Sequence, residues 1–399
     1  MLQRERAEHR LTVLHISQPV DGGVARVVTD LVRSQSESGV RAVVACPPGG
    51  MLGEAAAAAG AEVLDWPAGR EPGVRLPREA ARLARIVRRA GPDLVHAHSA
   101  KAGLAGRLVV RGRIPTVYQP HAWSFDAVGG LVAELALRWE RFAARWACCV
   151  LCVSEDERLH GRRSGVPGRW SVIHNGVDTA RFRPVGARER RLARERLSER
   201  YGISPTAPLV ACVGRLCRQK GQDVLLRAWP RIAAEVPGSR LVLVGDGPQA
   251  AALRAAAPRG VVFAGRTGDA VPWYTAADLV VQPSRWEGMA LSPLEAMACG
   301  RPVVVSDVSG ARESLPDRHA PVCLVPPGDP GALARALAAL LADAELRETL
   351  GQQARRHAHA TYDVRQTAAA VSQLYRELLG PGAVHRVGPH INRRERTGR

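Results

Sequence analysis

Short apolar runs alternate with longer amphipathic segments along most of this chain, and the whole alternation occurs twice. The runs expected to form strands are residues 11–16, 41–45, 93–97, 116–119 and 148–153, followed by 209–213, 240–244, 260–264, 279–282 and 302–306. Near-continuous Val and Leu runs between helices are typical of parallel strands that are buried on both faces. Two successive sets of strand–helix units predict an α/β protein with two doubly wound, Rossmann-like domains.

A length of 399 residues fits two such domains. We expect the first to span residues 1–185 and the second 186–363, because the chain between the two sets of strands is rich in Arg and Glu and carries prolines. Residues 364–379 have the periodicity of a last amphipathic helix. Residues 381–399 are rich in Gly, Pro and Arg, which predicts a disordered basic tail.

The composition is that of a soluble globular protein, with 46% hydrophobic and 24% charged residues. The net charge is +18, and basic surfaces attract nucleic acids, anionic lipids or phosphorylated substrates. The chain lacks the basic–aromatic pattern that stacks bases, so we expect no nucleic-acid partner. It also lacks a signal peptide and the roughly 18–20 apolar residues of a membrane span. We expect a cytoplasmic protein, in solution or at the inner face of the cell membrane.

The sequence gives little support for a bound metal. Cys149 and Cys152 form a lone C-x-x-C, and no second pair of ligands stands at zinc-site spacing. His96 and His98 are a second candidate pair, but no Asp, Glu or Cys partner is evident for them. We therefore predict no metal site and interpret these residues as core or wall side chains.

The strongest local pattern is Gly214-Arg215-Leu216 followed by Lys220, between an expected strand and an expected helix. Only two lysines, Lys101 and Lys220, occur among the 56 basic residues. A planar guanidinium and an ammonium beside backbone N–H groups at a helix start suit a diphosphate. A solvated turn with two surface cations explains the spacing equally well.

Two glutamates, Glu287 and Glu295, precede and enter a later helix. We expect Pro293 in the first turn of that helix, with Ser292 as its cap. Both carboxylates then lie at the carboxyl ends of parallel strands, where open α/β sheets bind ligands, and they suit sugar hydroxyls. For Glu295, favourable charge at a helix N-terminus is an alternative explanation.

The first half offers a similar but weaker pattern. Gly22 and Gly23 follow the first strand, where a Gly-rich turn can admit an anion. His121 follows another strand and could hydrogen-bond a reacting sugar.

Taken together, these motifs resemble the GT-B-fold retaining glycosyltransferases of the fourth sequence family, which act on nucleotide sugars. The matches are residues 172–178, Gly214-Arg215-Leu216 with Lys220-Gly221, residues 243–248, Glu287-Gly288, residues 295–303, and Gly310 with Glu313. They occur in the family's order and cover most of residues 10–380. One departure is His174, which stands where the family usually has Pro before Asn175.

The resemblance implies a catalytic cleft between the two domains, with the final helix (364–380) packing back on the first. It implies Arg215 and Lys220 on the donor diphosphate, Glu295 on the ribose, Glu287 and His121 on the transferred sugar, and Gly23 near the phosphates. The residues expected to bind substrate are Gly22, Gly23, Gly214, Arg215, Lys220, Arg266, Glu287, Gly288, Met289, Ala290, Leu291 and Glu295, with His121, Glu287, Arg215 and Lys220 catalytic. No metal and no cofactor are expected beyond a UDP- or GDP-sugar as co-substrate.

The resemblance further implies transfer of a hexosyl unit with retained configuration, without a side-chain nucleophile. Residues 95–103 look like members that build polysaccharide or lipid-linked glycans, which favours such an acceptor. Arg-rich helices near 78–90 and 138–145 suit an anionic membrane surface or plain solvent. Glycosylation of a soluble natural product, nucleotide-sugar epimerisation and a non-catalytic binding module are the alternatives.

Overall fold

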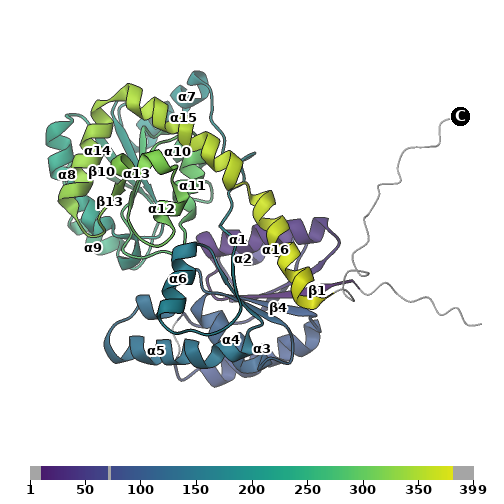
Figure 1. Cartoon of the computed structure of the whole chain (residues 1–399). Helices are drawn as coiled ribbons and strands as arrows, with labels where there is room; N and C mark the ends of the chain where they lie inside the picture. The colour runs from purple at the N-terminus through teal and green to yellow at the C-terminus, as the bar shows by residue number, and fades with distance from the viewer. Residues whose placement is uncertain (1–9, 71–72, 381–399) are drawn as a thin grey trace, which may run out of the picture. The chain divides into compact units, whose positions relative to one another are not determined.

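The computed structural model describes residues 10–70 and 73–380, which form two compact units (Figure 1). The first contains the chain up to Cys152, Gly161–Ile173 and the chain from Ala368, and the second contains Val153–His160 and His174–Thr367. This division differs from the expected boundary at 185/186. It places residues 174–185 with the second unit, where Asn175 Nδ2 donates to the Met289 carbonyl at 2.8 Å. The expected tail at 381–399 lies outside the described residues.

The first unit is built on a seven-stranded sheet in the order β3-β2-β1-β4-β5-β6-β7, with every pairing parallel. Its strands are β1 (Thr12–Ser17), β2 (Arg41–Cys46), β3 (Glu62–Asp65), β4 (Leu94–His98), β5 (Thr116–Gln119), β6 (Cys149–Cys152) and β7 (Trp170–Val172). Its helices are α1 (Gly23–Glu37), α2 (Met51–Ala58), α3 (Leu76–Ala90), α4 (Ser99–Val110) and α5 (Gly130–Ala143). Helices α6 (Glu155–Arg163) and α16 (Val364–Leu379) have residues in both units.

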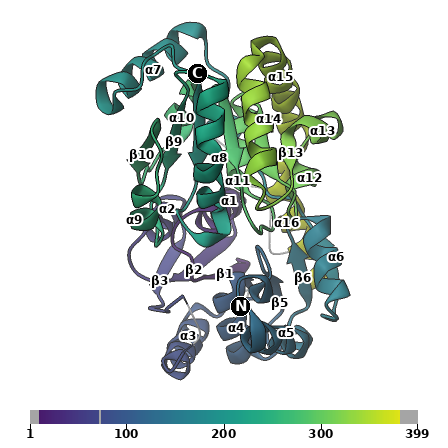
Figure 2. The ribbon, with the colours of Figure 1, turned by 90° about the vertical axis from the view of Figure 1, so that its left-hand side faces the viewer.

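The second unit is built on a six-stranded parallel sheet in the order β10-β9-β8-β11-β12-β13. Its strands are β8 (Leu209–Val213), β9 (Arg240–Val244), β10 (Val261–Gly265), β11 (Leu279–Gln282), β12 (Val303–Ser306) and β13 (Leu324–Val325). Its helices are α7 (Ala187–Tyr201), α8 (Gln222–Glu235), α9 (Ala250–Ala255), α10 (Val271–Ala276), α11 (Leu291–Ala298), α12 (Ala311–Ser314), α13 (Ala320–Cys323), α14 (Pro330–Ala342) and α15 (Ala344–Thr361). Helices α8 and α14 lie side by side on it (Figure 2).

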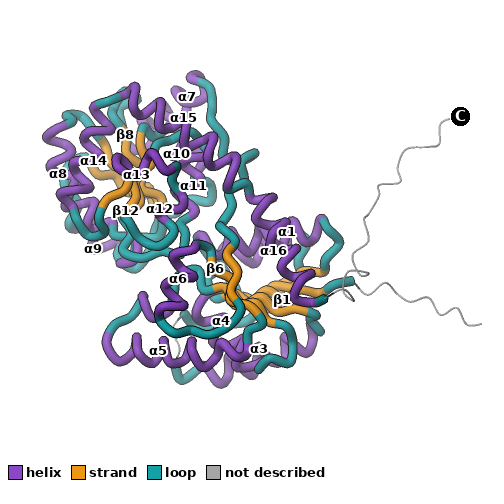
Figure 3. Tube along the Cα trace, in the orientation of Figure 1, coloured by secondary structure: helices purple, strands orange, loops and turns teal. Residues whose placement is uncertain are grey.

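Both sheets are enclosed by helices, as Figure 3 shows for each unit. Strands β8, β9, β11 and β12 are Val- and Leu-rich and almost wholly buried, which is what a parallel sheet covered on both faces requires. In each sheet the chain runs first toward one edge and then returns to build the other, so the order reverses between β1 and β4 and between β8 and β11. The prediction of two doubly wound parallel sheets is confirmed.

The first unit also buries two ion pairs between its helices, one from α4 to α3 and one from α4 to α5. Lys101 Nζ lies 2.6 Å from Glu79 Oε2, and Arg107 lies 2.7 Å from Glu140 Oε2, with all four side chains almost fully buried. Removing one partner of such a pair would leave the other as an uncompensated buried charge, which is strongly destabilising. Lys101, one of the two lysines, therefore belongs to the core.

Candidate active site

The site predicted in the second unit is built at the point where the strand order reverses. Strands β8 and β11 are neighbours in the sheet, and the loops that follow them carry residues 214–221 and 283–290. The chain from β8 continues toward β9 on one side, whereas β11 begins the other side. Open α/β sheets bind ligands in the crevice that this reversal leaves at the carboxyl ends of the strands.

Glycines allow these loops to touch through their backbones. Gly221 has φ +65°, and a Cβ atom there would lie 1.9 Å from the Pro283 carbonyl oxygen. Gly245 has φ +148°, and a Cβ there would lie 2.0 Å from the Gly214 carbonyl oxygen. Backbone hydrogen bonds join the same loops, since Gly214 N donates to the Val244 carbonyl and Arg285 N to the Gln219 carbonyl. The loops after β8, β9 and β11 thus form one interlocked backbone.

Lys220 and Glu287 meet across this interlocked backbone. Lys220 Nζ lies 2.5 Å from Glu287 Oε1, which also accepts a hydrogen bond from Ser284 Oγ at 2.7 Å. Gln219 Nε2 donates to the Trp286 carbonyl and fixes the next part of the loop. The Lys220 side chain keeps 20% of its surface exposed, and an ammonium group has three N–H donors. Lys220 can therefore hold Glu287 and still reach a ligand.

Two arginines that follow strands β8 and β10 of this sheet add positive charge. Arg215 follows β8 and is exposed, and in the described part of the chain its guanidinium has no hydrogen bond or ion pair. Arg266 follows β10 and is also exposed. Lys220 and Glu287 offset each other's charge, so Arg215 supplies a net positive charge beside them.

The loop from Gly288 to Leu291 is held from its own unit. Ser154 Oγ donates to the Gly288 carbonyl at 2.9 Å, and Asn175 Nδ2 donates to the Met289 carbonyl. Helix α11 begins at Leu291, with Ala290 before it. The expected cap at Ser292 is wrong: Ser292 lies inside the helix, and its hydroxyl pairs with the Tyr274 hydroxyl at 3.0 Å.

Glu295 is positioned by the same tyrosine. Tyr274 donates its hydroxyl hydrogen to Glu295 Oε2 at 2.8 Å, and both side chains are buried. Burial holds the pKa of Tyr274 well above its usual value, so the phenol stays a donor. The carboxylate of Glu295 is thereby oriented before any ligand arrives.

In the first unit, Gly22 and Gly23 lie at the reversal point between β1 and β4. Gly22 has φ +79° and precedes helix α1, which begins at Gly23, and both glycines are exposed. Open space surrounds the position of a Cβ on Gly22. No side chain therefore crowds Gly22, directly before a helix N-terminus of the kind that binds anions.

His121 follows β5 in a strained backbone conformation and ends a chain of histidines. Its φ is +56°, and Ala122 after it has φ +114°. His121 Nε2 lies 3.2 Å from His98 Nδ1, and His98 Nε2 lies 3.0 Å from His15 Nδ1. His15 Nε2 in turn lies 2.9 Å from Gln35 Oε1. Sequence reasoning found His121 but not the chain behind it.

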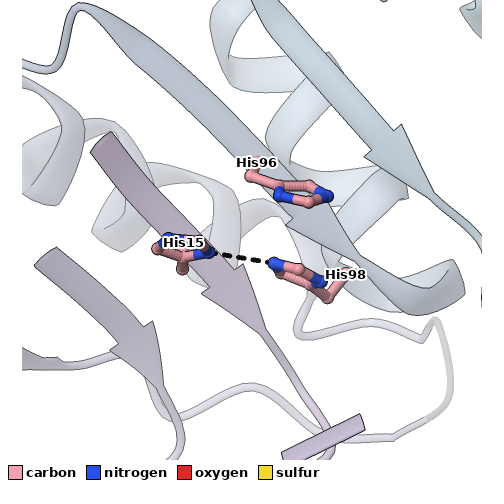
Figure 4. A group of neighbouring side chains, drawn as sticks. All are labelled: His15, His96 and His98. Carbon is pink, nitrogen blue, oxygen red and sulfur yellow. Dashed lines mark hydrogen bonds between the residues drawn. The ribbon is translucent and has the colours of Figure 1, made fainter. Parts of the chain in front are cut away.

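His15 joins the His96–His98 pair on one face of the sheet (Figure 4). Parallel register places His15 beside His96, and the ligand atoms of the three imidazoles lie within 4.8 Å of one another. Burial lowers the pKa of His15 to about 4 and the pKa values of His96 and His98 well below their usual range. Neutral imidazole is the form that binds metals. The nitrogens of His15 and His98, however, are already hydrogen-bonded to each other.

Comparisons with known proteins match both halves of the chain. Residues 21–181 match the model of "Glycosyltransferase Family 4", and residues 207–343 that of "Glycosyl transferases group 1". The D-inositol 3-phosphate glycosyltransferase of Salinispora arenicola is 34% identical over 315 residues, which are 72% of this chain and 69% of that enzyme. The chain belongs to glycosyltransferase family 4. The family predicted from the motifs is confirmed, and the protein is a glycosyltransferase.

Another relative of this glycosyltransferase is the lipopolysaccharide core biosynthesis mannosyltransferase LpcC of Rhizobium leguminosarum, 34% identical over 53% of this chain and 60% of that enzyme. Among solved structures, the Anabaena protein Alr3699/HepE in complex with UDP-glucose has a TM-score of 0.78 at 24% identity. The match covers 92% of this chain and 99% of that one. This likeness shows the GT-B fold. In the described residues, the glycosyltransferase has no helix long and apolar enough to cross a membrane.

The buried histidines of this glycosyltransferase predict a pH-dependent stability. Unfolded histidines titrate near pH 6.5, whereas burial lowers the folded pKa of His15 to about 4. Between these values only the unfolded chain takes up the proton, so the free energy of unfolding should fall as the pH falls. The slope is about 1.4 kcal/mol per pH unit for one such histidine. Amide hydrogen exchange of β1 and β4 at pH 7.5 and 5.5, corrected for the intrinsic exchange rate at each pH, measures this change in the free energy of unfolding.

His15→Gln is the comparison for this prediction, because it removes one titrating group. The variant should show a smaller fall in stability between the two pH values, whatever its absolute stability. Equal pH slopes in the two proteins would contradict the depressed pKa.

Proposed function

We propose that this glycosyltransferase moves a hexosyl unit from a nucleoside diphosphate sugar to an acceptor hydroxyl, with retention of the anomeric configuration. One observation carries the proposal: Arg215 and Lys220 lie in the same loop after β8, at the reversal point of the second sheet, and the Arg215 guanidinium has no partner in the described part of the chain. A guanidinium and an ammonium beside a strand end suit the two phosphates of such a donor.

We assign the other parts of the donor, its ribose and its transferred sugar, to the remaining site residues. We assign the ribose hydroxyls to Glu295, oriented by Tyr274, and the transferred sugar to Glu287 and His121. We assign an anion-binding role to the backbone N–H groups of Gly22 and Gly23 at the start of α1. The backbone and side chains of Gly214, Arg266, Gly288, Met289, Ala290 and Leu291 complete the donor site.

In the proposed reaction, the bond between C1 of the sugar and the phosphate oxygen breaks, and its electron pair goes to the diphosphate. The acceptor oxygen bonds C1 from the same face, and its proton passes to the departing phosphate oxygen. Negative charge grows on the diphosphate as the bond stretches. Cations that are already in place stabilise this charge without reorganising, which is the largest single contribution in many enzymes.

We propose that these cations take the place of a divalent metal and that no cofactor is needed. Support for the donor class comes from the Anabaena protein, which was solved in complex with UDP-glucose. Support for an acceptor in glycan assembly comes from the relative named for biosynthesis of the lipopolysaccharide core. A UDP- or GDP-sugar and a polysaccharide or lipid-linked acceptor are therefore the substrates proposed.

The test is a panel of UDP- and GDP-hexoses with candidate acceptors, in the presence and absence of EDTA. The true donor should raise Tm, because it binds only the folded state. Proton NMR of the product should show the donor's own anomeric configuration, and EDTA should leave the rate unchanged. An inverted product or loss of activity in EDTA would contradict the mechanism. Release of epimerised free sugar would show an epimerase, and binding of the donor without turnover would show a non-catalytic binding module. Preference for a soluble natural product would contradict the glycan acceptor.

We also propose that helix α5 docks the enzyme on an anionic membrane at the inner face of the cell. Leu131 and Leu135, one helical turn apart, are 79% and 62% exposed. Arg138 is seven residues after Leu131, which places it on the same face, and it pairs with Glu134 at 2.7 Å. The Arg145 guanidinium stacks 3.7 Å from the centre of the Phe142 ring. Exposed apolar side chains flanked by arginines fit the boundary between acyl chains and anionic headgroups.

Co-sedimentation with vesicles tests this docking. The protein should bind phosphatidylglycerol vesicles, and the double variant Leu131→Asp, Leu135→Asp should lose most of that binding. Leu192→Asp is the control, because Leu192 is also exposed but belongs to α7 of the second unit. Equal binding of all three proteins, or equal binding to phosphatidylcholine, would rule the helix out.

A further inference from the structure

The chain of histidines in the first unit has a defined direction. His15 and His98 are fully buried, and His121 at its end is partly exposed. Each link joins two nitrogens, or a nitrogen and the amide oxygen of Gln35, at 2.9 to 3.2 Å. The links connect helix α1 with β1, β4 and the turn after β5, so they lead from the interior to the candidate site.

The position of each hydrogen in this series of histidines can be deduced from the end at Gln35. A neutral imidazole has one N–H donor and one bare nitrogen. The oxygen of Gln35 can only accept, so His15 carries its hydrogen on Nε2 and leaves Nδ1 bare. His98 must then donate from Nε2 to His15, which leaves its own Nδ1 bare for the Nε2–H of His121. The geometry therefore places the hydrogen of His121 on Nε2 and leaves Nδ1 as an acceptor.

The surroundings keep the chain in this uncharged form. Burial lowers the pKa of His121 to about 3, that of His15 to about 4 and that of His98 well below its usual range. The groups that face the chain are the imidazole of His96, the Tyr375 phenol and the Gln119 amide. None of these groups carries a charge at neutral pH.

The backbone conformation at His121 is a second indication that the surrounding structure fixes the position of this residue. A positive φ is sterically strained for a residue other than glycine. Two successive residues, His121 and Ala122, adopt one here. Such strain persists only where the surrounding structure holds it, and it is concentrated at functional sites.

We propose that Gln35, His15 and His98 are positioning residues that hold His121 as its Nε2–H tautomer, so that Nδ1 accepts a hydrogen bond from a hydroxyl of the donor sugar. This inference rests on the proposed function, which places the sugar at His121. The three positioning residues do not touch the sugar themselves. Their role is to decide which nitrogen of His121 it meets.

Gln35→Leu is the decisive variant, because it removes the acceptor at the far end and leaves every imidazole in place. In protein labelled with ¹⁵N-histidine, long-range ¹H–¹⁵N spectra should show His121 as one Nε2–H tautomer in the wild type and as a mixture in the variant. The kcat/KM for the nucleotide sugar should fall about 10–100-fold, the range seen when partners that orient a functional histidine are lost. Gln35→Glu restores an oxygen acceptor and should recover both readouts.

His96→Gln is the matched control. His96 is equally buried on the same sheet face, but its Nδ1 bonds Tyr375 Oη at 2.6 Å and not the chain. This variant should lower stability without changing the His121 tautomer or kcat/KM. If Gln35→Leu fails to fold, His98→Gln carries the same test, since it removes the imidazole that accepts from His121 Nε2.

The spectra separate failure of this inference from failure of the proposed function, because they need no substrate. An unchanged His121 tautomer in Gln35→Leu overturns the proposal that Gln35 sets this tautomer through His15 and His98, whatever the activity. A changed tautomer with unchanged kcat/KM, in an enzyme that His121→Ala impairs, overturns its role in catalysis. One equivalent of zinc bound to His15, His96 and His98 in protein purified without chelator also overturns it, since metal-bound nitrogens cannot bond each other. If the wild type transfers no sugar, the proposed function fails while the tautomer result still stands.

Discussion

Replacing Lys220 by alanine is expected to lower kcat/KM for the nucleotide sugar by about 10²–10³-fold, or roughly 3–4 kcal/mol of transition-state stabilisation. The ammonium is one of two cations at the reversal point of the second sheet, and it also holds Glu287 at 2.5 Å. The substitution therefore removes a charge from the leaving diphosphate and frees a carboxylate beside it. Steady-state kinetics over a range of donor concentrations measures the effect.

Arg218→Ala is the matched control for this prediction. Arg218 is two residues away in the same loop, is exposed and is also a cation, but the sequence and the structure give it no place in the site. Its removal should change kcat/KM by less than about 3-fold, through the weakened long-range field alone. Equal losses in the two variants would mean that the loop acts through net charge and that Lys220 has no specific role.

The second large effect is expected at Gly221, where alanine should disrupt both stability and activity. A positive φ costs alanine about 1–2 kcal/mol, and forcing an atom into an occupied space adds about 1–3 kcal/mol. The new Cβ would lie 1.9 Å from the Pro283 carbonyl oxygen, so the loops after β8 and β11 must separate. A shift of about 1 Å in catalytic groups can cost about 10²-fold in rate. Thermal unfolding and kcat/KM should both record the change.

Gly202 provides an unusually close comparison. Its backbone angles equal those of Gly221, φ 65° and ψ 22°, yet open space surrounds the position of its Cβ. Gly202→Ala should therefore cost only the backbone strain and leave kcat/KM unchanged. If both substitutions lower the stability by the same amount and neither changes kcat/KM, the contact between the two loops does not contribute to function.

Much of the fold could be predicted from local patterns. Strands such as β8, β9 and β11 occur where the Val- and Leu-rich runs predict them, because a buried parallel strand needs a continuous apolar run. The short edge strand β13 (Leu324–Val325) and strand β3 (Glu62–Asp65) were not predicted. Edge strands are covered by few neighbours and need little apolar sequence. The bounds of helix α4 could not be predicted, because its small residues are almost uniformly apolar and show weak amphipathic periodicity.

The candidate site divides in the same way. Arg215, Lys220, Glu287 and Glu295 stand in short motifs. The first three lie in the loops after β8 and β11, which are neighbouring strands of the second sheet, and Glu295 lies in helix α11. Their supports are far away in the sequence: Asn175 holds the Met289 carbonyl, and Tyr274 holds Glu295. His15 lies 83 residues before His98, and only the register of β1 and β4 brings them together. No local spacing encodes such pairs. Ser292 shows the converse, since a residue typical of helix caps is used by a neighbouring side chain instead.

The scarcity of lysine has a practical consequence. The sequence holds only two side-chain amines; Lys101 is sealed in the core against Glu79, whereas Lys220 keeps a fifth of its surface open to solvent. Acylating reagents should therefore label a single lysine in the native enzyme. A saturating nucleotide sugar should shield that lysine, so mass spectrometry of one modified peptide can report donor occupancy without any measurement of turnover.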